Sequence, residues 1–210
     1  MTPWLLFGAG SGVGACLLQR ALACNQPVVL VLRDSEQARQ WREQGVTVVE
    51  GDACEPAVVA AACQAAGPEA VIVSTLGGGS VNYLGHRALI DGAEQAGLKR
   101  MLLVTSLGCG DGWPLLSARA KAAFGLAVRE KSLAECWLQS SSLDYAIVRP
   151  GGLLDVVATH NGQLTQGPAT LGLISRQDVA FALEKLLLQP VFGNQIYNLI
   201  DPDLEMPAVR

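Results

Sequence analysis

Four glycines lie close together near the start of the chain, at Gly8, Gly10, Gly12 and Gly14. They follow the apolar residues 4–7 and precede apolar residues at helical spacing, so the sequence predicts a strand that turns directly into a helix. Such a turn brings free backbone N–H groups and the positive end of a helix dipole to one point, which suits a pyrophosphate. We therefore predict that this loop is the floor of a dinucleotide site.

The next charged residues bear on which dinucleotide the site binds. About twenty residues after the glycines, where an acidic side chain would bind the ribose 2′-hydroxyl of NAD, the sequence has Arg33 followed by Asp34. An arginine favours the 2′-phosphate of NADP, because its planar fork pairs with phosphate oxygens through two hydrogen bonds. NADP is the predicted cofactor. Alternatively, Arg33 is a solvated charge at a strand end, and Asp34 keeps NAD as an alternative cofactor.

Asp52 follows the third apolar run and is our candidate to accept a hydrogen bond from the adenine amino group. The alternative is that Asp52 caps a helix that begins near Glu55.

The elements that must position these residues alternate along the chain. Buried parallel strands are nearly continuous apolar runs, whereas helices repeat apolar residues every three or four positions. This alternation predicts a doubly wound α/β fold of Rossmann type, with a mostly parallel sheet and helices on both faces. The predicted strands are 4–7, 28–32, 46–49, 70–74, 101–106, 145–149 and 195–200, and the predicted helices are 13–22, 34–44, 55–66, 82–95, 118–140 and 175–188.

Two glycine-containing segments leave the predicted sheet and are candidates to hold a substrate. Residues 107–117 leave the carboxyl end of the fifth strand, the edge at which ligands bind in this architecture. Residues 153–172 are polar and weakly periodic, and so long a loop usually serves a site, so we predict a substrate flap. His160 and Trp113, one on each segment, either shape the substrate pocket or serve only packing. We expect one domain, residues 1–210, with a small substrate-side region from about residue 151 to 175.

Composition narrows the class of partner. Half of the 210 residues are apolar, and the net charge is −4 without a basic run, so we expect one large core, small-molecule ligands, and neither nucleic acid nor a membrane as a partner. No apolar stretch reaches the ~20 residues that span a bilayer, and no basic segment precedes the first strand, which favours a cytoplasmic protein. The oligomeric state is expected to be a monomer or a homodimer.

The cysteines and histidines do not predict a metal site. The six cysteines lie among alanines and leucines with no Cys-x-x-Cys pair, so we interpret them as small buried hydrophobes in a reducing compartment. The two histidines, His86 and His160, are far apart in sequence, which argues against zinc.

Together these motifs are similar to those of the short, atypical branch of the short-chain dehydrogenase/reductase superfamily. Within that branch the chain resembles the NAD(P)-binding, NmrA-like group that includes relatives of biliverdin and flavin reductases. The resemblance runs nearly end to end and implies both the fold and the cofactor. The residues that carry it are Gly8-x-x-x-Gly12-x-Gly14, Arg33, Gly51-Asp52, Val104-Thr105-Ser106-Leu107-Gly108, Lys131-x-x-x-Glu135, Leu143-Asp144-Tyr145-x-Ile147-Val148-Arg149-Pro150-Gly151 and Ile174-Ser175-x-x-Asp178-Val179-Ala180.

The resemblance also implies where a catalytic centre would lie. In the superfamily a serine, a tyrosine and a lysine cooperate: the tyrosine hydroxyl protonates the carbonyl that receives hydride, and the lysine holds the nicotinamide ribose. The serine corresponds to Ser106 and the lysine to Lys131, but the tyrosine position is Ala127. We therefore assign Ser106 to polarising a substrate and Lys131 to the ribose hydroxyls. The alternatives are a strand-end hydroxyl bonded to backbone for Ser106 and an exposed helix charge for Lys131.

Without the tyrosine, the resemblance implies an NADPH-dependent reductase of a conjugated or aromatic acceptor, such as a flavin or quinone, for which the cofactor carries the difficult chemistry. The alternative is a non-catalytic NADP(H)-binding redox sensor or assembly factor. Tyr83 and Tyr145 are poor substitutes for the missing acid. The predicted cofactor contacts are Gly8, Gly10, Ser11, Gly12, Val13, Gly14, Arg33, Asp52, Ala53, Thr75, Leu76, Gly77, Lys131, Pro150 and Gly151.

Overall fold

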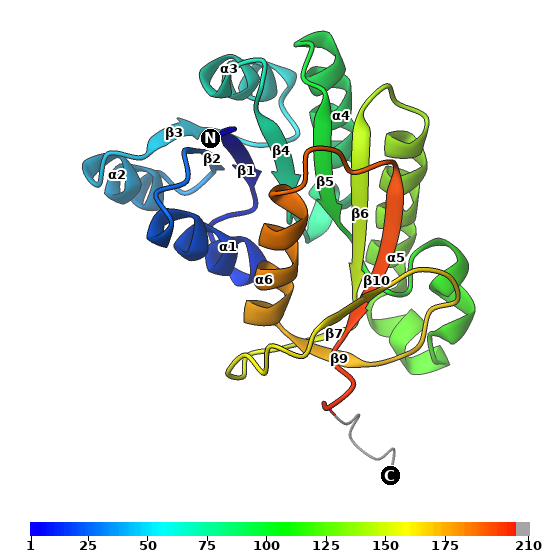
Figure 1. The fold of residues 1–210 in the computed structure, drawn as a ribbon. Helices are drawn as coiled ribbons and strands as arrows, with labels where there is room; N and C mark the ends of the chain where they lie inside the picture. The colour runs from blue at the N-terminus through cyan, green and yellow to red at the C-terminus, as the bar shows by residue number, and fades with distance from the viewer. Residues whose placement is uncertain (205–210) are drawn as a thin grey trace.

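An eight-stranded sheet forms the centre of the structure, a computed structural model that describes residues 1–204. Its strands are β1 (Trp4–Phe7), β2 (Val28–Leu32), β3 (Thr47–Glu50), β4 (Val71–Ser74), β5 (Arg100–Val104), β6 (Asp144–Pro150), β8 (Gln163–Thr165) and β10 (Gln195–Ile200). Their order across the sheet is β3-β2-β1-β4-β5-β6-β10-β8, and every pair is parallel except β10 with β8 (Figure 1). The doubly wound, mostly parallel sheet that the sequence predicts is confirmed.

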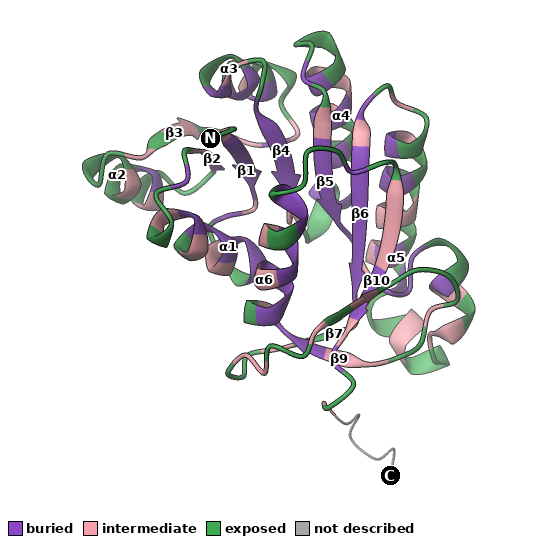
Figure 2. Ribbon diagram, viewed as in Figure 1, coloured by how far each residue is buried: buried purple, intermediate pink, exposed green. Residues whose placement is uncertain are grey.

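Six α-helices cover the two faces of this sheet in the described chain. One face carries α1 (Gly12–Ala23), α2 (Ser35–Glu43) and α6 (Arg176–Leu187), and the other carries α3 (Pro56–Ala66), α4 (Leu84–Gln95) and α5 (Ala118–Gln139). Strand β1 supplies both cores, because alternate side chains of a strand point to opposite faces: Trp4 and Leu6 belong to the first core, and Leu5 and Phe7 to the second. The central strands are accordingly buried throughout (Figure 2).

The segment between β6 and α6 is more ordered than the sequence indicates. Strands β7 (Gly152–Leu154) and β9 (Leu173–Ser175) form a small parallel sheet, and β8 lies at the edge of the main sheet, with Thr165 opposite Asn198. The prediction that residues 153–172 are an irregular loop was therefore wrong in part. Each of these strands has three residues, too few for the alternation that reveals a strand in a sequence.

Helix α6 begins as its spacing predicts. The Ser175 hydroxyl accepts a hydrogen bond from the Asp178 backbone N–H at 2.9 Å and donates to Asp178 Oδ2 at 2.7 Å. The spacing is that of a capping box, but the Asp178 carboxylate accepts from the Ser175 hydroxyl and not from the Ser175 backbone N–H. This pair of hydrogen bonds fixes the direction in which the chain leaves β9, and so it also fixes the position of the next residue, Arg176.

The burial of the cysteines differs in part from the prediction that all six are buried. All six are free thiols, but only Cys63 and Cys109 are buried, whereas Cys24 and Cys136 are exposed. The interpretation of all six as buried hydrophobes was therefore wrong for the exposed pair, because an alanine- and leucine-rich helix also has a face that meets solvent.

Residues 1–204 show neither a membrane-spanning helix nor a metal-binding cluster. None of the helices there is long and apolar enough to cross a membrane. The same residues include no group of three or more His, Cys, Asp or Glu side chains that are placed to hold a metal ion.

Candidate functional site

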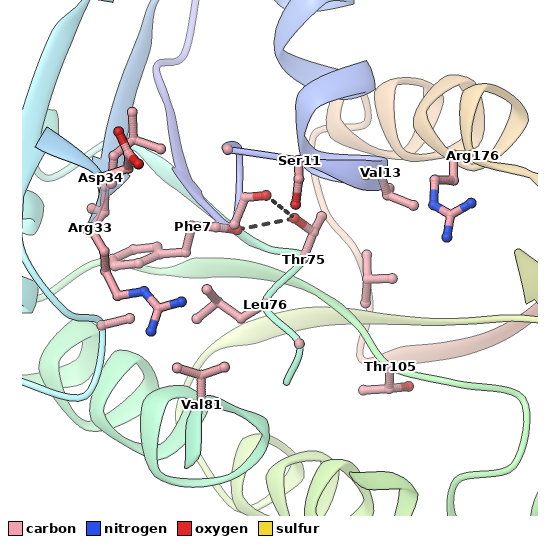
Figure 3. Close-up of a pocket in the computed structure, with 18 of the residues that line it drawn as sticks. Phe7, Ser11, Val13, Arg33, Asp34, Thr75, Leu76, Val81, Thr105 and Arg176 are labelled. Atoms are coloured by element: carbon pink, nitrogen blue, oxygen red, sulfur yellow. Dashed lines mark hydrogen bonds between the residues drawn. The ribbon is translucent and has the colours of Figure 1, made fainter. Parts of the chain in front are cut away.

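A cavity of about 460 Å³ opens at the carboxyl ends of β1 and β4. These neighbouring strands mark the point where the strand order reverses, which is where ligands bind in open α/β sheets. The glycine loop after β1 forms one wall, and Figure 3 shows Arg33 and Arg176 on opposite sides of Thr75 and Leu76. Twelve of the predicted cofactor contacts line this cavity: Gly8, Gly10, Ser11, Gly12, Val13, Arg33, Ala53, Thr75, Leu76, Gly77, Lys131 and Pro150.

The glycine loop leaves no room for side chains where it meets its neighbours. Gly8 has φ +89°, and a Cβ atom there would lie 2.6 Å from Thr75 Oγ1. A Cβ atom at Gly14 would collide with the carbonyl oxygen of Gly8, so Gly14 serves the close packing of α1 on the loop. At the start of α1, Ser11 makes no side-chain cap and the first turn carries no acidic residue. The helix N-terminus therefore keeps N–H donors for an anion, which fits the pyrophosphate of a dinucleotide.

Arg33 and Asp52 lie beside each other at one end of the cavity. The Arg33 side chain is 71% exposed, and its Nη1 lies 3.7 Å from Asp52 Oδ2. Asp52 accepts a hydrogen bond from the Cys54 backbone N–H at 2.8 Å, and this bond, with the nearby Arg33, lowers the pKa of its carboxyl group. Asp52 is not among the lining residues. It holds the turn before α3, whose N-cap is Glu55, so Asp52 does not cap that helix directly.

The loop after β4, residues 75–82, forms hydrogen bonds to the end of β1 on one side and to α5 on the other. Thr75 Oγ1 is within hydrogen-bonding distance of the carbonyl oxygens of Phe7 (3.3 Å) and Gly8 (3.2 Å). On the other side, Asn82 in the short 3₁₀ helix η1 (Gly79–Asn82) accepts from the Gly78 N–H at 3.0 Å and donates to Glu130 on α5 at 3.1 Å. The second glycine loop is therefore fixed to both β1 and α5.

Lys131 projects from α5 into this arrangement. Its Nζ lies 3.6 Å from the position that a Cβ atom would take at Gly77. Burial lowers the pKa of the Lys131 ammonium group. Lys131 therefore lies against the second glycine loop, and Ala127, the position that the resemblance assigns to the tyrosine, lies one helical turn earlier on α5.

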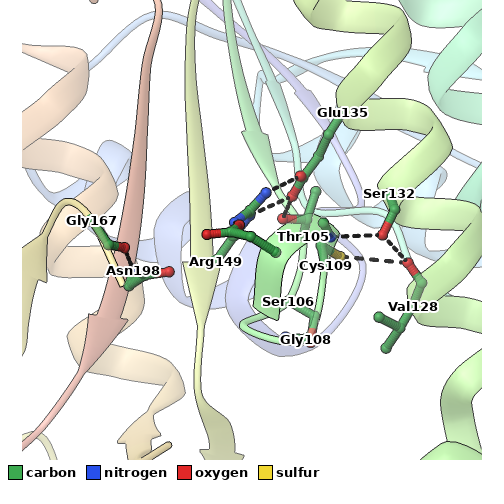
Figure 4. Close-up of polar contacts among 12 residues, drawn as sticks. Thr105, Ser106, Gly108, Cys109, Val128, Ser132, Glu135, Arg149, Gly167 and Asn198 are labelled. Carbon is green, nitrogen blue, oxygen red and sulfur yellow. Dashed lines mark hydrogen bonds and ion pairs between the residues drawn. The ribbon is translucent and has the colours of Figure 1, made fainter. Parts of the chain in front are cut away.

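The serine and threonine that follow β5 face different surroundings. Thr105 lines the cavity and donates from Oγ1 to Glu135 Oε1 at 2.5 Å. Glu135 also forms a two-point ion pair with Arg149, through Nε at 3.0 Å and Nη2 at 2.6 Å (Figure 4). Ser106 is not among the lining residues, and its Oγ accepts a long hydrogen bond, 3.5 Å, from the Gly108 N–H. The role assigned to Ser106 stays a prediction.

Other predicted candidates lie away from the cavity. Gly151 packs against the Gly172 carbonyl and does not line the cavity. The Tyr83 ring makes an edge contact with Trp137, and Tyr145 is buried in β6. His160 and Trp113 are also absent from the lining: His160 meets the Phe181 ring, and Trp113 lies under Lys121 and Arg129.

Sequence reasoning missed one charged residue of the cavity, Arg176. Its Nε would lie 3.7 Å from a Cβ atom at Gly12, so the guanidinium faces the glycine loop from the start of α6. In the sequence Arg176 is an ordinary first-turn residue behind an N-cap, far from the glycines. The Ser175-x-x-Asp178 spacing indicates where α6 begins, but it does not indicate which element the start of α6 faces.

Comparison with known proteins agrees with this geometry. The model of the NAD(P)H-binding family matches residues 8–190. The structure of ChuY, an anaerobillin reductase from Escherichia coli O157:H7, is 58% identical with a TM-score of 0.95, covering 98% of this chain and 100% of that chain. An NAD(P)H azoreductase of Xenophilus azovorans is 22% identical over 206 residues, which are 94% of this chain and 68% of the relative. An uncharacterized sugar epimerase of Bacillus subtilis, YhfK, is 29% identical over 217 residues, covering 94% of each.

Proposed function

The chain belongs to the NAD(P)H-binding family and is an oxidoreductase of that family, and from this premise we propose that it uses NADPH to reduce a conjugated acceptor of the bilin type. The observation that carries the proposal is that the glycine loop, Arg33 and Lys131 line the same cavity. Ala127 occupies the position at which the resemblance expects the catalytic tyrosine. The 58% identity to an anaerobillin reductase supports a bilin over the flavins and quinones that the sequence alone favours.

The preference for NADPH over NADH rests on Arg33 and its neighbour. Arg33 is exposed at the cavity edge, and its long ion pair with Asp52, 3.7 Å, leaves the guanidinium accessible to a 2′-phosphate. Asp34, the residue that would favour NAD, accepts from the Gln37 N–H at 2.8 Å as the N-cap of α2. A carboxylate engaged in capping is a weaker partner for ribose hydroxyls, which supports NADP.

The remaining residues suit hydride transfer without a protein acid. Bound NADPH supplies a hydride. Lys131 lies against Gly77 in the cavity wall, which supports a role for its ammonium group in holding ribose hydroxyls. Leu76 and Leu153 give the cavity apolar surface for a conjugated ring system. In such an acceptor the negative charge that arrives with the hydride is delocalised, so water is a sufficient source of the accompanying proton.

The test is NADPH oxidation with four acceptors: biliverdin as the bilin probe, FMN, a quinone and an azo dye. We expect the bilin to be reduced with the highest kcat/KM. Lys131→Met is expected to lower kcat/KM about 10-fold or more, through the loss of a charge-assisted contact. Lys121→Met is the matched control, because Lys121 lies on the same helix over Trp113 and outside the cavity lining.

A non-catalytic role is the second candidate, and two observations favour it. Ala127 cannot donate a proton, and the Ser106 hydroxyl is not among the groups that line the cavity. Tight NADPH binding without turnover of any of the four acceptors would contradict the reductase and support an NADP(H)-binding redox sensor or assembly factor.

A further inference from the structure

Arg176 is a cavity cation without a role in the proposed chemistry. It is the first residue of α6, it lines the cavity, and its side chain is 28% exposed. It faces Gly12 at the N-terminus of α1, where the first turn carries no acidic side chain to balance the N–H groups. An arginine and a free helix N-terminus at the same place both favour an anion with several oxygens.

In this structure the partner of Arg176 is Asp155. The ion pair joins Nη1 to Oδ1 at 2.8 Å, and the Asp155 side chain is 84% exposed. Asp155 directly follows β7, in the segment that continues with the exposed residues Val156 and Val157. So exposed a pair contributes little to stability, about 0–1 kcal/mol, and a phosphate group makes a stronger, two-point partner for a guanidinium.

We propose that Arg176 is a ligand of the cofactor pyrophosphate and that Asp155 occupies it only while the cofactor is absent. Binding of NADPH then exchanges one anion for the other and releases residues 155–157. The next residues stay in place, because Thr159 and His160 donate backbone hydrogen bonds to Asp178 at 3.0 and 2.9 Å. The release is therefore local, and it frees two exposed valines, Val156 and Val157, which follow the cavity residue Leu153 in the chain, to cover an acceptor after the cofactor has bound.

The proposal rests on the cofactor of the family and not on the reductase activity, so direct binding tests it. Isothermal titration calorimetry with NADPH should give an affinity about 10- to 100-fold weaker for Arg176→Gln. Asp155→Asn should bind NADPH about 2- to 5-fold more tightly, because the competing carboxylate is gone. The double variant should match Arg176→Gln alone, since Asp155 has no other effect on binding. Arg20→Gln, which breaks the α1–α6 ion pair with Glu184 outside the cavity, is the control and should leave the affinity unchanged.

Three results would overturn the proposal. One is an unchanged NADPH affinity in folded Arg176→Gln. Another is weaker binding by Asp155→Asn, a variant of an exposed residue that is expected to fold. The third is an equal loss of affinity for adenosine 2′-monophosphate in Arg176→Gln, since that ligand has no pyrophosphate.

Limited proteolysis tests the release itself. Thermolysin cleaves before apolar residues, so cleavage at Val156 and Val157 should be faster in the wild type with NADPH than without it. In Asp155→Asn the same cleavage should be fast in both conditions. A cleavage rate that NADPH leaves unchanged or lowers in the wild type would refute the release of this segment.

Discussion

Arg33 and Asp34 are adjacent, yet their side chains have different partners. Asp34 caps α2, whereas Arg33 projects to the cavity edge with Asp52 3.7 Å away. The carboxylate of Asp52 is also bound to the Cys54 N–H, so Asp52 neutralises Arg33 only in part. A 2′-phosphate would give the guanidinium a better partner than this distant carboxylate.

Arg33→Ala should therefore change the choice of cofactor more than the fold. A lost charge-assisted hydrogen bond costs about 1.5–3 kcal/mol, so we expect NADPH affinity to fall about 10- to 100-fold while NADH affinity changes little. Fluorescence titration with both cofactors measures the ratio. Arg39→Ala on α2 is the control, because Arg39 pairs with Glu36 and Glu43 on its own helix and does not line the cavity. An unchanged ratio of the two affinities would show that Arg33 does not select NADPH.

At the scale of elements, the start of α6 holds three parts of the structure together. Asp178 is buried, receives the Ser175 cap, and accepts the backbone N–H groups of Thr159 and His160. Burial alone would raise the pKa of Asp178, but these hydrogen bonds outweigh it and lower the pKa. One carboxylate therefore joins β9, α6 and the segment that carries Asp155.

Asp178→Ala should destabilise the protein more than loss of the cap alone. Removal of the cap by Ser175→Ala should cost about 1 kcal/mol, whereas Asp178→Ala leaves the Thr159 and His160 N–H groups without their charged partner and should cost about 2–4 kcal/mol. Urea unfolding of both variants measures the difference. Similar free energies of unfolding for the two variants would mean that the segment at residues 159–160 gains nothing from Asp178.

At the scale of the whole molecule, His86 couples stability to pH. It is fully buried on α4, its Nδ1 bonds the Asn82 carbonyl at 2.8 Å, and Nε2 has no partner in the described structure. Burial lowers the pKa of His86 from 6.5 to about 4. Between about pH 6.5 and pH 4, His86 is protonated in the unfolded chain but neutral in the folded chain. The free energy of unfolding therefore falls as the pH is lowered through this range.

The expected loss from His86 is about 3 kcal/mol between pH 7 and pH 4, from the difference between the two pKa values. Urea unfolding at several pH values measures it, and His86→Leu should remove this part of the slope even if the variant is less stable at pH 7. The only other histidine, the exposed His160, supplies the control as His160→Gln. A slope that persists in His86→Leu would assign the effect to carboxyl groups instead.

The local features of the site follow from the sequence. An apolar run, closely spaced glycines and a helical pattern specify a strand, a turn and a helix by residue type alone, and the alternation of periods specifies the doubly wound sheet. The glycine loop, Arg33 and Lys131 line one cavity, and their roles toward a cofactor stay predictions.

The tertiary structure decided which distant side chains meet, and in which direction they point. Thr105 and Ser106 directly follow β5, but Thr105 lines the cavity and bonds Glu135 on α5, whereas Ser106 does not line it. Arg176 reaches the glycine loop because α6 packs on α1, across more than 150 residues of chain. The sequence by itself determined the fold and the cofactor loop, because these depend on local periodicity and backbone freedom. The position of Arg176 opposite the glycine loop, and its ion pair with Asp155, depend on contacts that form only when separate elements pack.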